Sequence, residues 1–188
     1  MDPDPRPPRE LRTERLWLRS GRAGDEPALQ GALVSSRDSL HPWMSFALED
    51  HDLETLGVVC RRSEELWEQR SAFVWRLWDP AGETLIGTVD LHEFQPRVPL
   101  CGLGYWLRTS HVGRGLASEA VRAVVAAGRE ALGLVRIEAR CDVRNERSSR
   151  LLERVGFEFE GIAKHDDRDG DGRLSSDRVY ARTWPEDA

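Results

Sequence analysis

The sequence contains few cysteines, and their arrangement argues against two classes of protein. There are three among 188 residues, at Cys60, Cys101 and Cys141. An odd number does not fit a disulfide framework, and the separations match no metal-ligand pattern. We therefore expect reduced, interior thiols, a cytoplasmic location and no metal.

Long apolar runs and basic charge are also lacking. No segment approaches the ~18 residues that a transmembrane helix requires, and the N-terminal MDPDPRPPRE is too polar for a signal peptide. The net charge is −6, whereas polyphosphate binders are usually basic, so we expect neither a membrane nor a nucleic-acid partner. The charge suits a cationic partner such as an amine, although a solvated acidic surface explains it more simply.

The remaining patterns describe one mixed domain. A chain of 188 residues is most simply a single domain, here residues 10–188, preceded by a flexible proline-rich tail over 1–9. Period-two patterns predict strands at 14–19, 72–79, 84–94, 100–108, 134–143, FEFEG and 172–183. Helical periodicity predicts helices at 24–40, 52–70, 116–133 and 145–157, with a loop at 41–50. A strand meander followed by one β-α-β unit indicates an α/β (α+β) fold with a mixed, mostly antiparallel sheet and one parallel pair.

A glycine pair marks the start of that β-α-β unit. Residues 108–120 read RTSHVGRGLASEA, so a glycine loop joins a strand to the N-terminus of a helix, which is a phosphate-binding arrangement. An ATP-type loop requires Gly-Lys-Ser/Thr, but Leu116 follows Gly115. A dinucleotide loop requires glycine or alanine where Ser118 stands, and an early β-α-β unit. Coenzyme A is the ligand class that remains.

The downstream sequence carries a family resemblance. HVGRGLASEA is followed by RIEARCDVRNERSSRLLERVGFEFEG, and together these segments resemble the GNAT superfamily of acyl-CoA-dependent N-acetyltransferases. The opening LRTERLWLR and the HPWM loop resemble its RimJ/RimL-like branch, the ribosomal-protein N-terminal acetyltransferases. The resemblance covers about residues 10–184. The family loop is Q/R-x-x-G-x-G/A; here Ser110 occupies the first position, which we expect to weaken binding rather than abolish it.

The resemblance implies where acetyl-CoA lies. In the GNAT fold the parallel strands, here 100–108 and 134–143, splay apart and hold the acyl-CoA between them. Its pantetheine would pair with the backbone of Trp106 and Leu107 as an added strand does. Its pyrophosphate would lie on the amides of residues 112–117, namely Val112, Gly113, Arg114, Gly115, Leu116 and Ala117.

Two residues of the motif Asn-x-x-Ser have implied roles. Ser148 matches the serine whose hydroxyl lies near the sulfur in RimL-like enzymes, so it is the candidate general acid; packing or capping of the short helix is the alternative. Asn145 matches the asparagine that contacts pantetheine, and it is equally suited to cap the helix that follows.

The general base has several carboxylate candidates. Glu138 lies on the polar face of its strand, where Arg136 or Arg140 would pair with it. Asp166 and Asp167 resemble in position a carboxylate assigned as base in RimL-like enzymes, although a solvated acidic turn explains them more simply.

Other titratable groups are also candidates, so the sequence does not identify the general base. His41 and His111 are titratable, and a water relay would require neither. The segment DDRDGDGR (166–173) resembles a calcium loop, but Arg178 replaces the required glutamate, so a hairpin turn is expected.

Two functions follow as hypotheses. The first is transfer of an acetyl group from acetyl-CoA to a primary amine, on a protein N-terminus or a small molecule, by direct attack in a ternary complex. The second is a catalytically silent acyl-CoA-binding sensor or interaction module. Homodimerisation, common among relatives, is also expected.

Overall fold

The structure of the protein, a computed structural model, describes residues 5–48, 51–95 and 97–185. The strands are β1 (Glu10–Arg12), β2 (Trp17–Ser20), β3 (Phe73–Trp78), β4 (Leu85–Gln95), β5 (Leu100–Leu107), β6 (Arg136–Asp142), β7 (Glu158–Arg168) and β8 (Leu174–Thr183). The α-helices are α1 (Glu26–Val34), α2 (Arg37–Leu40), α3 (Leu53–Gln69), α4 (Leu116–Leu132) and α5 (Glu146–Arg154). Two 3-10 turns are η1 (Ser45–Leu48) and η2 (Thr109–His111).

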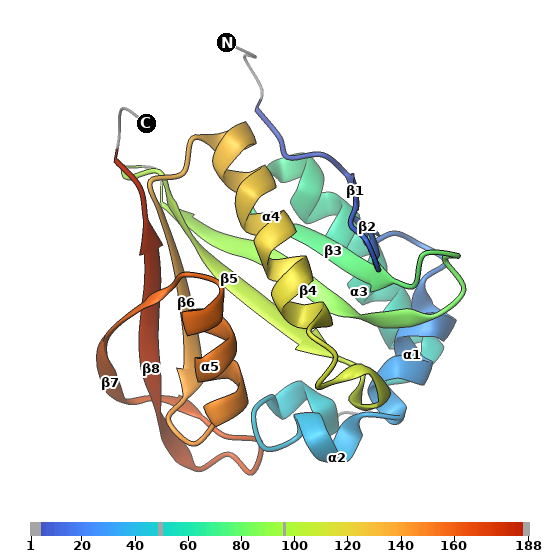
Figure 1. Cartoon of the computed structure of the whole chain (residues 1–188). Coiled ribbons are helices and arrows are strands. Elements are labelled where there is room, and N and C mark those ends of the chain that lie inside the picture. Colours follow the sequence, from blue (N-terminus) through green and yellow to red (C-terminus); the bar gives the residue numbers. More distant parts are fainter. Residues whose placement is uncertain (1–4, 49–50, 96, 186–188) are drawn as a thin grey trace.

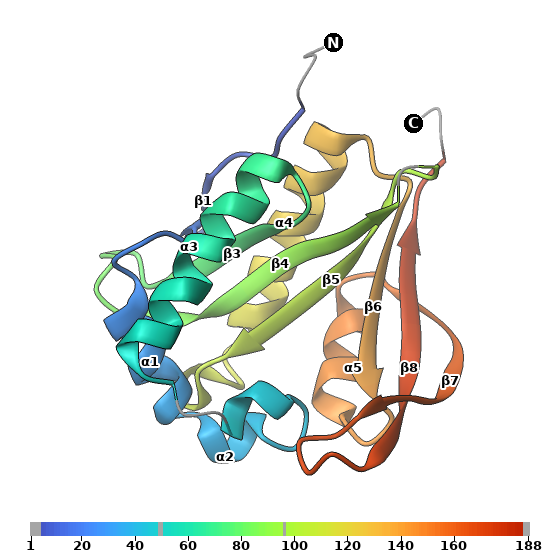
Figure 2. The ribbon, with the colours of Figure 1, turned by 180° about the vertical axis from the view of Figure 1, so that it is seen from behind.

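The strands form one mixed sheet with helices on both faces. Its order is β1-β2-β3-β4-β5-β6-β8-β7, and β5–β6 is its parallel pair. Helices α4 and α5 lie on one face (Figure 1), while α1 and α3 cover the opposite face (Figure 2). The predicted mostly antiparallel sheet with one parallel pair is confirmed.

The core lies between the sheet and α4. Alternate residues of the central strands point to it because side chains alternate along a strand, and Val89, Leu91 and Leu103 are buried there. Helix α4 ends at Gly133, which has φ 61°, as predicted. On α4, the apolar residues Leu116, Ala120, Val124 and Ala127 are buried, whereas Ala123 and Ala131 are partly exposed.

The parallel pair separates after a short contact. Strand β5 pairs with β6 only where Leu100–Gly102 faces Arg136–Glu138. Beyond that point β5 stays paired with β4, and β6 stays paired with β8. The two strands therefore diverge toward α2 (Figure 2), which confirms the predicted splay.

Two predicted elements differ in the structure. The helix predicted at 24–40 is divided into α1 and α2, because the Ser35 hydroxyl donates to the carbonyl of Gly31 (2.7 Å) and the Ser36 hydroxyl accepts the amide of Thr109 (3.0 Å). The closing strand predicted as FEFEG continues to Arg168 as β7.

The loop predicted at 41–50 contains η1, and its residues 49–50 lie outside the described residues. Residues 1–4 of the predicted tail also lie outside them. Within residues 5–9, Arg6 forms an ion pair with Glu68 (2.7 Å). The carbonyl of Pro8 accepts a hydrogen bond from Trp75 Nε1 (3.1 Å).

The cysteines are all buried and free, which confirms the prediction of interior thiols. Among the described residues, no helix has the length and apolar character needed to cross a bilayer. Within the same ranges, no group of three or more His, Cys, Asp or Glu residues is arranged to hold a metal ion.

Candidate active site

A cavity of about 790 Å³ occupies the gap between the diverging strands. This volume suits a small-molecule or cofactor site. Its walls come from segments far apart in sequence: the α2 loop, β5, the glycine loop with the start of α4, the end of β6 with α5, and the β7–β8 hairpin.

The glycine loop presents backbone amides to this cavity. Gly113 and Gly115 both have φ 78°, a conformation that a residue with a Cβ adopts at a cost. Gly115 is the N-cap of α4, and no side chain caps the helix. The first amides of a helix lack backbone partners, so this terminus favours an anion. Arg15 fixes the loop by donating to the carbonyl of Arg114 (2.8 Å).

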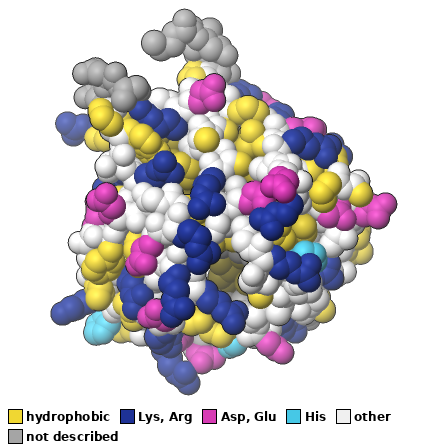
Figure 3. Space-filling model, in the orientation of Figure 1, with side chains coloured by type: hydrophobic (Ala, Val, Ile, Leu, Met, Phe, Trp, Pro, Cys, Tyr) yellow, Lys and Arg dark blue, Asp and Glu magenta, His cyan; other side chains and the backbone are white. Residues whose placement is uncertain are grey.

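A stripe of arginines lies beside the loop. Arg147, Arg150 and Arg154 line the cavity from one face of α5, and all three are exposed. Figure 3 shows Lys and Arg side chains gathered along the middle of the face that carries α4 and α5. The spacing i, i+3, i+7 of the arginines in NERSSRLLER indicates that they share one helix face, although they are not among the predicted site residues. We call the glycine loop and these arginines the basic end of the cavity.

Asn145 and Ser148 meet at the middle of the cavity. The Asn145 side chain accepts the backbone amide of Ser148 (3.1 Å), so its capping role is confirmed, and both residues line the cavity. The Ser148 hydroxyl lies 2.6 Å from the hydroxyl of Tyr105. Tyr105 is not among the predicted site residues, because its contact across the gap depends on tertiary structure.

Burial keeps two nearby groups protonated. It raises the pKa of the Tyr105 phenol far above the ordinary value, and it raises the pKa of the Cys141 thiol. Cys141 lines the cavity, but a protonated thiol is a weak nucleophile. The hydroxyl pair of Tyr105 and Ser148 therefore stays protonated and can donate a hydrogen bond, and the Cys141 thiol is not suited to attack.

The structure separates the predicted site residues. Arg114 and Glu138 do not line the cavity. These predicted site residues do line it: Trp106, Leu107, Val112, Gly113, Gly115, Leu116, Ala117, Asn145, Ser148 and Asp167. Trp43 also lines it, whereas Trp67, Trp75 and Trp78 are buried in the core.

Glu138 is held in ion pairs. It accepts hydrogen bonds from Arg136 (2.9 Å) and Arg140 (3.0 Å). Burial alone would raise the pKa of Glu138, but these hydrogen bonds outweigh it and lower the pKa below its ordinary value. A carboxylate stabilised in this way is a weak base.

The far end of the cavity is lined by acidic groups from three strands, Asp142 on β6, Asp167 on β7 and Asp177 on β8, and by Asp169 in the adjoining turn. We call it the acidic end. Arg144 contacts Asp142 (2.6 Å) and Asp169 (3.2 Å), and its hydrogen bond lowers the pKa of Asp142.

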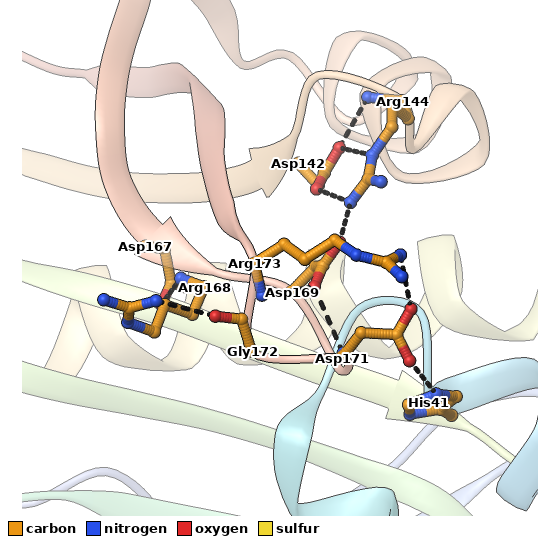
Figure 4. A network of polar contacts seen from close by, with 9 residues as sticks. All are labelled: His41, Asp142, Arg144, Asp167, Arg168, Asp169, Asp171, Gly172 and Arg173. Atoms are coloured by element: carbon orange, nitrogen blue, oxygen red, sulfur yellow. Dashed lines mark hydrogen bonds and ion pairs between the residues drawn. The ribbon is translucent and has the colours of Figure 1, made fainter.

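The tip of the β7–β8 hairpin is tied to the loop after α2. Figure 4 shows Asp171 between Arg173 (2.8 Å) and His41 (3.0 Å). Asp169 accepts the amides of Asp171 (3.1 Å) and Arg173 (3.0 Å). The segment resembling a calcium loop is therefore a hairpin turn, as predicted, and it closes the acidic end.

Sequence comparison identifies the family. Residues 15–158 match the model of the acetyltransferase (GNAT) domain. The chain belongs to the GNAT acetyltransferase family. It is 32% identical over 160 residues to a [ribosomal protein uS5]-alanine N-acetyltransferase of Escherichia coli, covering 82% of this chain and 80% of that protein.

Solved structures show the same fold. RimL, a ribosomal L7/L12 α-N-protein acetyltransferase in complex with coenzyme A, matches with a TM-score of 0.84 at 20% identity, over 91% of this chain and 95% of that one. The microcin C7 self-immunity acetyltransferase MccE, in complex with acetyl-CoA and AMP, matches with a TM-score of 0.85 at 15% identity, over 92% and 94%. This acetyltransferase therefore has the GNAT fold, as expected.

Proposed function

We propose that this acetyltransferase transfers the acetyl group of acetyl-CoA to the α-amino group of a protein N-terminus, by direct attack in a ternary complex. The observation that carries the proposal is a single cavity that joins an anion-binding loop to a face lined by carboxylates. The names of the relatives, several of them ribosomal-protein N-terminal acetyltransferases, support the acceptor class.

The basic end suits the phosphates of coenzyme A. The uncapped α4 terminus offers backbone amides, and Arg147, Arg150 and Arg154 offer positive charge. The stretch of β5 that no longer pairs with β6, including Trp106 and Leu107, offers backbone groups on that edge to the pantetheine in the manner of an added strand. Arg114 contributes its backbone to the loop.

Acetyl-CoA supplies the activated thioester when bound. Tyr105 and Ser148, 2.6 Å apart, form a donor pair at the middle of the cavity; Ser148 donates toward the departing sulfur and Tyr105 keeps that hydroxyl oriented. Transfer forms the N–C bond and breaks the C–S bond. An acceptor ammonium gives an amide, a thiol and one released proton, so the site needs a proton acceptor at the acidic end.

An α-amine suits this chemistry. Its pKa is about 8, against about 10.4 for lysine, so far more of it is neutral near pH 7. The protonated thiol of Cys141 favours direct attack over an acyl-enzyme. Of the predicted bases, Asp167 lines the cavity as an exposed carboxylate, and Glu138 is paired outside the cavity.

Release of the coenzyme A thiol tests the proposal. The acceptors are a peptide with a free N-terminal alanine, one with a free N-terminal serine, and an N-terminally blocked peptide with one lysine. We expect thiol release and a mass gain of one acetyl group with the first two. Coenzyme A binding without turnover on any amine would favour the sensor module instead. Homodimerisation stays a prediction; a solution mass near the 21.4 kDa of one chain would contradict it.

A further inference from the structure

One carboxylate at the acidic end has no partner. Asp177 is only 8% exposed, and the structure gives its carboxylate no hydrogen bond or ion pair with any described residue. Its backbone amide, by contrast, donates to Asp166 (3.3 Å). Burying an ionised carboxylate without a partner is unfavourable, and no hydrogen bond or ion pair from the described residues offsets the cost at this position.

The carboxylate faces the side of the sheet opposite α5, the helix that carries the arginines of the basic end. Its neighbours on β8 point the other way, since Arg178 bonds to Glu146 of α5 (3.0 Å) and Tyr180 to Glu153 of α5 (3.2 Å). Side chains alternate along a strand, so Asp177 points away from α5. It nevertheless lines the same cavity as Ser148, because the gap between β5 and β6 connects the two faces.

The charged groups around Asp177 are mostly paired with each other. Asp142, its cross-strand neighbour on β6, is paired with Arg144. Asp166 is paired with Arg140 (3.0 Å).

Asp167 on β7 is exposed, and its carboxylate accepts the backbone amide of Arg168 (2.7 Å). The arginines that contact this group of carboxylates thus form ion pairs with Asp142, Asp166 and Asp169. Asp177 is left available for a cation from outside the chain.

We infer that Asp177 binds the ammonium group of the acceptor and takes the proton that this group must lose before it attacks the thioester. The inference rests on the proposed function and names the residue that selects a primary ammonium as substrate. The step balances: one N–H bond of the ammonium breaks, one O–H bond forms on Asp177, and a neutral amine remains. The proton then passes to solvent.

The electrostatics agree with this role. Burial, followed by the charges of Asp166, Asp167 and Asp142, raises the pKa of Asp177 to about 6. The carboxylate is thus ionised near neutral pH, yet it is a stronger base than an ordinary aspartate. Asp142, directly across the ladder, has a lowered pKa. Such opposed shifts in neighbouring carboxylates are typical of acid–base sites.

The experiment compares Asp177→Asn with two matched variants. Asp167→Asn removes the exposed carboxylate on the same face. Glu158→Gln removes a charge from the exposed start of β7, outside the cavity. The probe is a peptide with a free N-terminal alanine, and its N-acetylated form is the control ligand. Two quantities are measured: kcat/KM between about pH 5 and pH 9, and peptide affinity in the presence of coenzyme A.

Asp177→Asn is expected to lower kcat/KM on the order of 100-fold and to abolish the rise of kcat/KM through about pH 6. It should also remove the preference for the free amine over the acetylated peptide. Asp167→Asn should change kcat/KM only a few-fold, and Glu158→Gln should match the wild type.

Unchanged kcat/KM and peptide affinity in Asp177→Asn would overturn the inference, as would a wild type with no preference for the free amine. If the wild type prefers the free amine, and Asp177→Asn does not, but no thiol is released, the ammonium site stands and the proposed function fails.

Discussion

The two ends of the cavity are built in different ways. The basic end consists of a short loop and two helices, with backbone amides and exposed arginines around a pair of glycines. The acidic end consists of carboxylates from three strands and one turn, and all but one of the buried ones carry an arginine partner. The basic end is suited to bind a polyanion. The acidic end is suited to take one positive charge at one place.

The two constructions suit two different chemical tasks, phosphate binding and proton removal. Many donors acting together bind phosphates strongly, and no single donor needs a special pKa. Removing a proton requires one group whose pKa is set apart from those of its neighbours. Variants at the basic end should therefore change the affinity for coenzyme A, and variants at the acidic end should change the pH dependence of kcat/KM and of stability.

The largest expected effect lies between the two ends. Ser148→Ala should reduce kcat on the order of 100-fold, because the donor to the sulfur is lost, while the affinities for coenzyme A and peptide stay unchanged. Ser149→Ala is the matched control, since Ser149 is buried and contacts Arg178 (2.9 Å) and Cys141 instead. Equal kcat in Ser148→Ala and the wild type, measured by thiol release, would remove Ser148 from the mechanism.

Among the kinetic and binding constants, a change at the basic end should alter the affinity for coenzyme A. Gly115→Ala strains a backbone with φ 78° at the proposed phosphate site, and should weaken coenzyme A binding about tenfold or more. Gly133→Ala carries similar strain at the opposite end of α4, where φ is 61°. Both variants should lose similar stability, but only the first should lose affinity in a calorimetric titration. Equal affinities would place the phosphates elsewhere.

The acidic end should gain stability when its unpaired charge is removed. The pKa of Asp177 is raised to about 6 in the folded protein. The protonated group is therefore favourable for folding below the unfolded pKa near 3.9, and this contribution is lost as pH rises through about 6 and the buried carboxylate ionises. Asp177→Asn should therefore unfold at a temperature a few degrees above the wild type at about pH 7.5, a gain of about 1 kcal/mol. The gain should vanish near about pH 4. A lower melting temperature at both pH values would mean that Asp177 has a structural partner.

The smallest effect concerns Arg140, which lines the cavity near the acidic end. Its positive charge lowers the pKa of Asp177. Arg140→Gln should move the rise of kcat/KM to higher pH by about half a unit, with little change in the plateau. A shift to lower pH, measured by initial rates, would contradict the assignment of that rise to Asp177.

The sequence predicted the glycine loop and the helix cap at Asn145 because their signals are local, whereas the arginines of α5 were not predicted. Gly113, Gly115 and Asn145 occupy fixed positions in a loop and a helix start, and the backbone conformation there depends on nearby residues. The splayed strand pair followed from the resemblance to GNAT proteins.

The acidic end was less predictable for a physical reason. Asp142 and Asp177 are far apart in sequence and meet through the β6–β8 register, which a single sequence does not determine. Which carboxylate lacks an arginine depends on that register too. Glu138 and Asp167 are both strand carboxylates, and the structure distinguishes them from Asp177 in different ways. Glu138 is paired with Arg136 and Arg140, whereas Asp167 is exposed and accepts the backbone amide of Arg168. The break at Ser35 and Ser36 likewise depends on Thr109, a distant residue.

A crystal structure with coenzyme A and the N-acetylated alanine peptide tests the account most directly. We expect the pyrophosphate on the amides of residues 112–117, the sulfur within reach of Ser148, and the acetylated nitrogen on the side of Asp177. Coenzyme A outside the gap between β5 and β6, or a peptide entering from the α5 side, would contradict the account.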